Sequence, residues 1–381
     1  MVFPYRFFPW TTTSHRLPVR ILFVYLLYIL GDTISICFSF PNRVAVFWIP
    51  NGITMAILIR SHYKSWFPYL IASFLAYFSI VYFTDQYTIS QIFSLGMGNC
   101  IEIGIGAWLF RFFTPQPIVL SDIKTMLHLI FLSGICGTAI GALFGAAVVV
   151  KIFGHHDYFQ VWSIWFAGDG IGTLLILPCI LAWTSSDTKT YSLRQRVEIG
   201  LHFLFCITAS ILIFSNLFSS VYAFTYFMFP LLLWAGLRFD LRITTLSLIV
   251  FCMVSSWFTN TGQGPFALHS QSLTPGVFTF QIFFGITIFT VLVVSTIIQE
   301  RKRIEMEKEA LIHSLENAIH QIKTLSGLLP ICSHCKKIRD EQGTWKALEE
   351  YIPMHSDAQF SHGICPECTK IHYPTYFSKI S

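Results

Sequence analysis

Apolar stretches about twenty residues long constrain this chain more than any other feature, because each can cross the hydrocarbon core of a bilayer as an α-helix. Ten such stretches precede residue 299, at 19–40, 44–60, 66–84, 89–113, 125–150, 159–183, 197–218, 221–237, 242–259 and 276–298. The stretches at 44–60 and 221–237 are short and contain Pro50 and Pro230, so one or both could be broken or re-entrant. The sequence therefore predicts an all-α polytopic membrane bundle with eight to ten transmembrane helices.

Charged residues are unevenly distributed along the chain. Residues 1–298 hold 14 Lys and Arg against 9 Asp and Glu, whereas residues 299–381 hold 11 of each. The net charge of +5 therefore comes from the apolar body, where basic loops serve membrane topology, and no nucleic-acid partner is expected. We predict a cytoplasmic segment at 1–18, a membrane domain at 19–298, a linker helix at 299–329 and a cysteine module at 330–381.

The positions of Lys and Arg predict the orientation of the bundle, because these residues resist translocation. With a cytoplasmic N-terminus, the outer segments hold only Arg43 and Lys151. The inner segments before the tail hold twelve basic residues: Arg6, Arg16, Arg20, Arg60, Lys64, Arg111, Lys124, Lys189, Arg194, Arg196, Arg238 and Arg242. We therefore expect a multi-pass protein with both termini in the cytoplasm and no cleavable signal peptide.

Several polar side chains fall inside the predicted spans. A lone acid at a helix centre costs on the order of 2.5–3.5 kcal/mol on insertion, so such groups face the bundle interior or water. Interhelical hydrogen bonding is one interpretation, and a cavity for a ligand or an ion is the other. Glu102 and Asp169 are the strongest candidates, whereas Asp32, near the end of its span, is expected to reach the interface. The candidate cavity residues are Glu102, Asp169, Asn51, Asn99 and His128.

Four strings occur in the order of a known family. They are FWIPNGITMAILI (47–59), GNCIEIGIGAWLFRFF (98–113), FAGDGIGTLLILPCILAW (166–183) and FPLLLWAGLRFDLRITTLSLIVFCMVSSWFTNTGQGPFA (229–267). Together they resemble the first membrane-associated sensor family, a MASE-type integral membrane sensory domain, over about residues 20–298. The resemblance implies a bacterial inner-membrane input module that precedes a cytoplasmic output. Its ligands are mostly undefined, so it assigns no binding residue. Asn51 departs from the family, which often has Ala there.

The segment that follows the last span has a heptad pattern. One core position holds Ile304, Leu311, Ala318 and Leu325, and the other holds Leu315, Ile322 and Leu329. This spacing predicts a parallel coiled coil, and hence a homodimer through 300–329. The alternative is a single amphipathic helix packed on the tail. In either case the helix continues the last span and could carry a displacement into the cytoplasm.

The tail contains two CxxC turns separated by 29 residues, Cys332-Ser-His-Cys335 and Cys365-Pro-Glu-Cys368. A reducing compartment disfavours disulfides, and two such turns can supply four thiolates to a tetrahedral zinc ion at about 2.3 Å. Four thiolates leave no open position for water, so the predicted zinc is structural, in a small zinc-ribbon-like module. A thiol redox switch is the competing interpretation.

The residues between the two turns predict a small core. Four apolar residues have helical spacing, and we expect them to pack against Phe360 and Ile364; they are Trp345, Leu348, Tyr351 and Ile352. The string from 323 to 374 resembles an uncharacterised cysteine-rich C-terminal module of bacterial signalling proteins, which implies a role in signal transduction.

The chain shows no kinase, cyclase, phosphodiesterase or hydrolase motif, so we do not expect an enzyme. We predict a sensory protein that detects a small molecule, a state of the membrane or a membrane partner. A dimeric helix would relay the change to the zinc module, which acts on an unknown cytoplasmic signalling protein. The alternative is a transporter or channel-like membrane protein with a regulatory metal-binding tail, using Glu102 and Asp169 as coupling sites.

Overall fold

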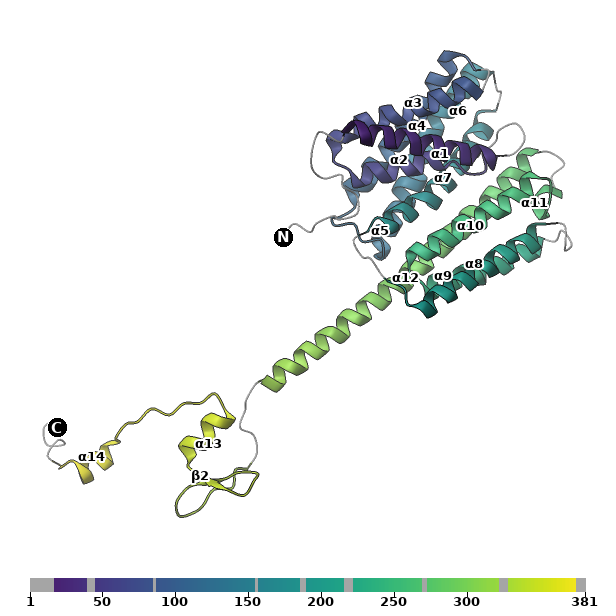
Figure 1. Ribbon diagram of the computed structural model, residues 1–381. Helices are drawn as coiled ribbons and strands as arrows, with labels where there is room; N and C mark the ends of the chain where they lie inside the picture. The colour runs from purple at the N-terminus through teal and green to yellow at the C-terminus, as the bar shows by residue number, and fades with distance from the viewer. Residues whose placement is uncertain are drawn as a thin grey trace. The chain divides into compact units, whose positions relative to one another are not determined.

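The computed structural model describes residues 17–39, 45–84, 87–154, 157–185, 190–215, 222–268, 273–321 and 328–374. The chain divides into two compact units, Met1–Arg303 and Ile304–Ser381 (Figure 1). Some residues used in the predictions lie outside the described ranges: Arg6, Arg16, Arg43, Lys189, Ile322 and Leu325.

The first half of the membrane unit is a bundle of helices around a short central one. Its helices are α1 (Leu17–Cys37), α2 (Ile49–Arg60), α3 (Trp66–Thr84), α4 (Ile89–Phe113), α5 (Ile123–His128), α6 (Thr138–Phe153) and α7 (Tyr158–Trp183), with a 3₁₀ turn at Tyr63–Ser65 and a π-helical segment at Leu129–Gly137 that joins α5 to α6. Helix α2 packs against α1, α4 and α7, and ten of its twelve residues are buried. Side-chain caps begin several helices, as where Thr88 and Gln91 form a capping box at α4.

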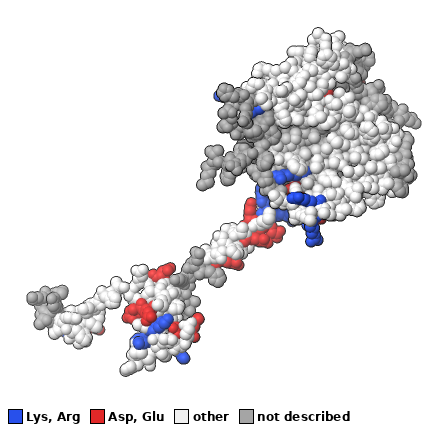
Figure 2. All heavy atoms as spheres, viewed as in Figure 1, with Lys and Arg blue, Asp and Glu red and all other residues white. Residues whose placement is uncertain are grey.

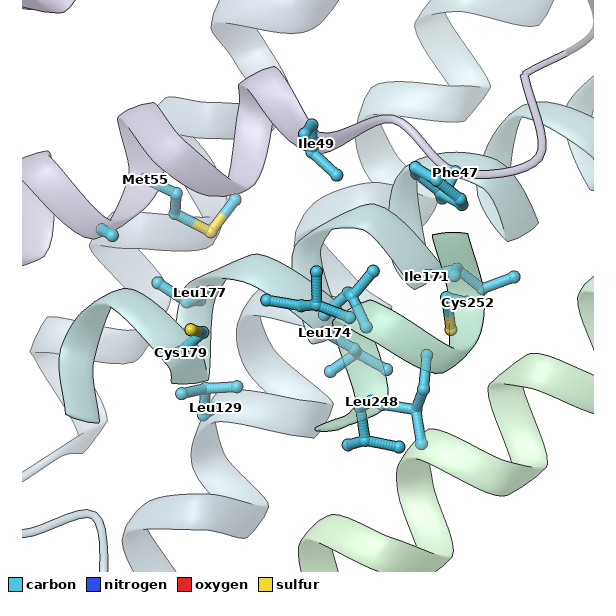
Figure 3. Close-up of a cluster of buried hydrophobic side chains, with 14 of the residues drawn as sticks. Phe47, Ile49, Met55, Leu129, Ile171, Leu174, Leu177, Cys179, Leu248 and Cys252 are labelled. Atoms are coloured by element: carbon cyan, nitrogen blue, oxygen red, sulfur yellow. The ribbon is translucent and has the colours of Figure 1, made fainter. Parts of the chain in front are cut away.

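The second half contains α8 (Leu193–Phe214), a 3₁₀ segment at Tyr222–Phe227, α9 (Met228–Arg238), α10 (Leu241–Asn260), α11 (Pro265–Leu268) and α12 (Leu273–Gln321). Figure 1 shows α8, α9 and α10 side by side with the first part of α12. Helix α10 also packs against α7, which joins the two halves. Figure 3 shows part of the resulting core, where Met55, Leu174, Leu248 and Cys252 gather from α2, α7 and α10.

Eight helices of the described residues are long and apolar enough to cross a membrane, which agrees with the lower end of the predicted range. The two short stretches form helices of only 12 and 11 residues, α2 and α9. The side chain of Arg20, near the start of α1, reaches Tyr69, near the start of α3, so both helices begin at one end of the bundle. The chain between them therefore returns through the bundle, by residues 45–48 and then α2.

Helix α9 returns the chain in the same way. Arg238, its last residue, forms a bidentate ion pair with Glu198 in the second turn of α8, at 2.6 and 2.9 Å. The end of α9 therefore lies where α8 begins. Both short stretches run back across the bundle, as broken segments rather than as long single helices.

Basic side chains gather at one end of the bundle and donate to backbone carbonyl groups there. Arg60 donates to the carbonyl of Leu181 at 2.9 Å, and Arg242 donates to that of Ala182 at 3.1 Å, both in the last turn of α7. Cations stabilise this end of a helix because its carbonyl groups have no partners within the helix. Figure 2 shows Lys and Arg along the lower edge of the bundle, while most of its visible face is uncharged.

The second unit contains a small hairpin and two short helices. Strands β1 (Ile338–Arg339) and β2 (Trp345–Lys346) pair antiparallel, and α13 (Leu348–His355) and α14 (Pro366–His372) follow. The predicted tail core is partly wrong. Trp345 lies in a strand rather than on the helix, and Phe360 and Ile364 are exposed. Tyr351 is buried as expected, stacked on His355 one turn later with ring centroids 4.0 Å apart.

Helix α12 is 49 residues long and continues without a break from the last span into the heptad segment. In the single chain, the heptad side chains Ile304, Leu311 and Leu315 are each more than half exposed. Their apolar surface is available for a partner helix, and the coiled coil stays a prediction.

Candidate functional site

A buried polar cluster lies where α1, α2, α4 and α7 meet. Helix α4 supplies Asn99 and Glu102, one turn apart, α7 supplies Asp169, α2 supplies Asn51 and α1 supplies Tyr28. All five side chains are at least 95% buried. Four of these five residues were predicted from the sequence as cavity residues, and the structure brings them together.

Hydrogen bonds connect three of the helices through this cluster. The Tyr28 hydroxyl donates to the Oδ1 atom of Asn51 at 3.3 Å, and the Nδ2 group of Asn51 donates to the Oδ1 atom of Asn99 at 3.3 Å. Tyr28 was missed by the sequence analysis. A Tyr in an apolar helix is common, although its hydroxyl needs a partner once the ring is buried, and that need was the available signal.

The two carboxyl groups of the cluster have unequal surroundings. The indole Nε1 group of Trp165, one turn before Asp169, donates to the Oδ2 atom of Asp169 at 2.7 Å. Glu102 lies beside Asp169 and Asn51, yet neither of its carboxyl oxygens has a well-formed hydrogen bond to any described residue. An unsatisfied buried carboxylate is costly, so the protonation or ligand state of Glu102 matters for the stability of the bundle.

Glycine residues allow the helices to approach closely at the cluster. A Cβ atom on Gly141 of α6 would lie 2.5 Å from the Cβ atom of Glu102 and 3.0 Å from its Oε2 atom. A Cβ atom on Gly172 of α7 would overlap the backbone of Trp48, which precedes α2. Gly141 therefore lets α6 pack directly on Glu102, and Gly172 lets the residue before α2 pack directly on α7.

Two other intramembrane candidates lie elsewhere. His128 is half-buried at the end of α5, where its Nδ1 atom and the Thr114 hydroxyl are 3.3 Å apart, and the structure does not bring it to the cluster. The expectation that Asp32 reaches the interface is wrong. Its side chain is wholly buried, close to Tyr28 and Tyr77, because α2 and α3 pack against α1.

The cluster is connected to α12 through residues 45–48, which are not helical. The amide of Trp48 donates to the carbonyl of Gly168, the residue before Asp169, at 3.0 Å. The side-chain amide of Gln281 in α12 donates to the carbonyls of Ala45 and Val46 at 3.2 and 3.4 Å. Gln281 was also missed by the sequence analysis, since its partners are more than 230 residues away.

The four tail cysteines form two separate pairs in the structure. Within the described residues, no group of three or more His, Cys, Asp or Glu side chains is arranged to hold a metal ion. Each turn nevertheless has the local chemistry of a thiolate ligand. Backbone N–H groups of Cys335 and His334 lower the pKa of Cys332, and the N–H group of Cys368 lowers that of Cys365. The zinc site at Cys332, Cys335, Cys365 and Cys368 stays a prediction.

Comparison with known proteins supports one assignment. No curated protein and no solved structure matches the chain. The MASE1 family profile matches residues 19–302, which include the whole buried cluster, Gln281 and the start of the linker helix. The match ends before the two CxxC turns, so the resemblance of the tail to a signalling module stays an expectation. Because the match covers most of its length, the chain belongs to the MASE1 family of membrane sensory domains.

Proposed function

We propose that this membrane sensor responds at the buried cluster of Tyr28, Asn51, Asn99, Glu102 and Asp169 and reports through α12 to the cytoplasmic tail. The observation that carries the proposal is the path of backbone contacts from the cluster to α12. Family membership supports a sensory role, and the buried acids provide a group whose state can change inside the membrane.

Where this path begins, at Asp169, the contact to the next residue is made by backbone atoms and not by a flexible side chain. Asp169 and Gly168 are adjacent residues of one helix, so a shift of the first displaces the carbonyl that holds Trp48. Residues 45–48 then carry the displacement to Gln281, whose two hydrogen bonds attach α12 to the segment. A tightly packed bundle passes small shifts between discrete arrangements instead of absorbing them.

Polar contacts also hold α12 where it leaves the bundle. The Lys302 ammonium group donates to the carbonyl of Leu237, near the end of α9, at 2.6 Å. Asp122, which caps the start of α5, interacts with two residues of α12: its carboxyl group hydrogen-bonds with that of Glu300 and is attracted by the positive charge of Arg303. These contacts lie in or near the basic end of the bundle, and a movement of α12 along or about its axis would change them.

Beyond the bundle, the proposed output is a parallel homodimer through 300–329 and a zinc-stabilised module that binds a cytoplasmic signalling protein. The exposed heptad side chains support the dimer, because burying them against a second copy removes apolar area from water. The two CxxC turns support the metal site, because zinc would bring together the pairs that the chain holds apart.

Photo-crosslinking in native membranes tests this relay. A benzophenone amino acid at Leu311 should capture a second copy of the chain, and Gln281→Leu should change the yield, because it removes the hydrogen bonds to residues 45–48. The matched control is Thr296→Val in the same helix, since the Thr296 hydroxyl donates to the carbonyl of Leu292 in its own helix and to no other described residue. Absence of any dimer crosslink at Leu311 would contradict the dimer. Equal yields in wild type and Gln281→Leu would contradict the relay.

A further inference from the structure

We infer that Glu102 and Asp169 form a proton-binding site, in which the two buried carboxyl groups share one exchangeable proton. The inference rests on the proposed function and names its stimulus: the ligand detected at the cluster is the proton. Its geometry comes from two buried acids, Glu102 of α4, whose carboxyl oxygens have no well-formed hydrogen bond to a described residue, and Asp169 of α7, which accepts from Trp165. No cation is paired with either acid among their described neighbours.

Charge repulsion is the first argument. Two carboxylates that lie side by side in a low-dielectric interior repel each other when both are ionised, and one proton between them removes the repulsion. The groups that act on Glu102 are Asp169 and Asn51, and Asn51 carries no charge. No basic side chain is among the groups that act on Glu102 or Asp169 in the described residues. Arg60, at the other end of α2 from Asn51, donates to the carbonyl of Leu181.

The hydrogen-bond donors assign the proton to one side of the pair. Asp169 receives the indole N–H group of Trp165, which stabilises a negative charge on that carboxylate. Glu102 receives no well-formed hydrogen bond from a described residue, so its carboxyl group is the better proton carrier. As a neutral acid it can donate to Asp169, and the pair then has a single negative charge.

Other titratable groups around the pair are few. Helix α1 contributes Tyr28 and Asp32, α3 contributes Tyr77 and α4 contributes Cys100, while α2 and α6 face it with the uncharged Asn51 and Gly141. Asp32 is the only other described carboxylate in this group, and it acts on Tyr28 and Tyr77 rather than on Glu102.

A metal ion fits the same place poorly. Ca²⁺ and Mg²⁺ take about six or more oxygen ligands. No group of three or more acidic, His or Cys side chains among the described residues is arranged for a metal. The side-chain oxygens of Asn51 and Asn99 already accept hydrogen bonds from Tyr28 and Asn51. A proton needs no cavity, and Gly141 packs directly on Glu102.

The proton changes the bundle through a balanced step. When the Glu102 O–H bond breaks and its proton leaves to solvent, the pair changes from one negative charge to two. The repulsion pushes α4 and α7 apart, and Gly168, next to Asp169, moves with α7. Rebinding of a proton reverses the displacement. The site therefore converts a change in proton concentration into movement of residues 45–48.

Infrared difference spectroscopy on the full chain in lipid nanodiscs tests the inference. At neutral pH, where exposed carboxyl groups are ionised, wild type should show a protonated carboxyl C=O band that disappears on alkalinisation. Glu102→Gln should remove the titrating component. The control variant Asp32→Asn should retain it, since Asp32 is another buried acid outside the pair.

Three results would overturn the inference. Wild type without a protonated carboxyl band at neutral pH would do so without any variant, which covers the case in which Glu102→Gln fails to fold. A titrating band that survives in folded Glu102→Gln would assign the proton elsewhere. Removal of the wild-type band by Na⁺, K⁺, Mg²⁺ or Ca²⁺ at constant pH would show a cation site. None of these results involves Leu311 or Gln281, so the relay would stand or fall by its own crosslinking test.

Discussion

Gly172→Ala should destabilise the bundle strongly, because α7 and the returning segment meet there backbone to backbone. An added Cβ atom would lie 2.7 Å from the backbone nitrogen of Trp48 and nearer still to its carbonyl group. Overpacking typically costs about 1–3 kcal/mol, and the cost falls when a flexible side chain can move away. Here the obstructing atoms are main chain, held by the hydrogen bond to Gly168, so we expect about 3 kcal/mol, the upper end of that range.

The matched control is Gly285→Ala in α12, where a new Cβ atom would meet nothing within 4 Å. Ala favours helix over Gly by roughly 1 kcal/mol, so this variant should be at least as stable as wild type. Unfolding by SDS in mixed micelles can be followed by the fluorescence of the ten Trp residues. A cost of about 3 kcal/mol corresponds to a change of roughly a hundredfold in the unfolding equilibrium constant.

Two results would refute this reasoning. Gly172→Ala that unfolds like wild type would show that α7 and residues 45–48 do not touch as described. Equal destabilisation by both substitutions would show that the bundle penalises any added methyl group, whatever the space around it.

The remaining predictions concern the tail and the topology. The purified full chain should contain zinc by elemental analysis, and Cys365→Ser should lose it; an unchanged zinc content would contradict the four-thiolate site. Desolvation raises the pKa of Asp340, but the Thr344 N–H group and Lys346 outweigh it and lower the pKa below its ordinary value. The ionised Asp340 carboxylate therefore stabilises the hairpin above the ordinary pKa of Asp, and this stabilisation is lost as the pH falls through the lowered value. Asp340→Asn should remove the stabilisation already at neutral pH, which would appear as faster amide exchange at Thr344. Equal exchange in the variant and wild type would contradict the contribution of Asp340. Reporter fusions after residues 64, 190 and 240 should be cytoplasmic and those after 85 and 265 external, and one inverted fusion would require a new assignment of the crossings.

Hydropathy predicted most of the helices, because long apolar runs have few alternatives in a bilayer. The same reasoning identified Glu102 and Asp169, since acids are rare in spans and costly unless they face the interior. It could not show that Asp32 is buried, because distance along the span does not reveal which segment folds back over it. Its position near the end of the span predicted an exposed carboxyl group, but α2 and α3 pack against α1 there and bury it.

Residues that act through the backbone were harder to predict. Gln281 looks like an ordinary polar residue in an apolar helix until its carbonyl partners in residues 45–48 are known. The role of Trp165 was equally hard to predict, because a Trp in a span usually indicates an anchor at the membrane interface, whereas this indole donates to Asp169. In the tail, the apolar spacing from Trp345 to Tyr351 resembled one helix, but Gly343 turns the chain with a positive φ of 83° and a hairpin forms first.

The non-helical crossing at residues 45–48 implies an unusual pattern of mutational tolerance. A backbone segment that lacks intrahelical hydrogen bonds inside a membrane has no water to bond to, so neighbouring residues must supply its hydrogen-bond donors and acceptors. Here the Ser35 hydroxyl accepts from the amide of Ile49. The Gln281 side chain donates to the carbonyl of Ala45, and the carbonyl of Gly168 accepts from the amide of Trp48. Saturation mutagenesis should therefore find that Ser35 and Gln281 tolerate apolar replacements as poorly as charged ones. Leucines that face lipid should behave differently, because they tolerate apolar replacements.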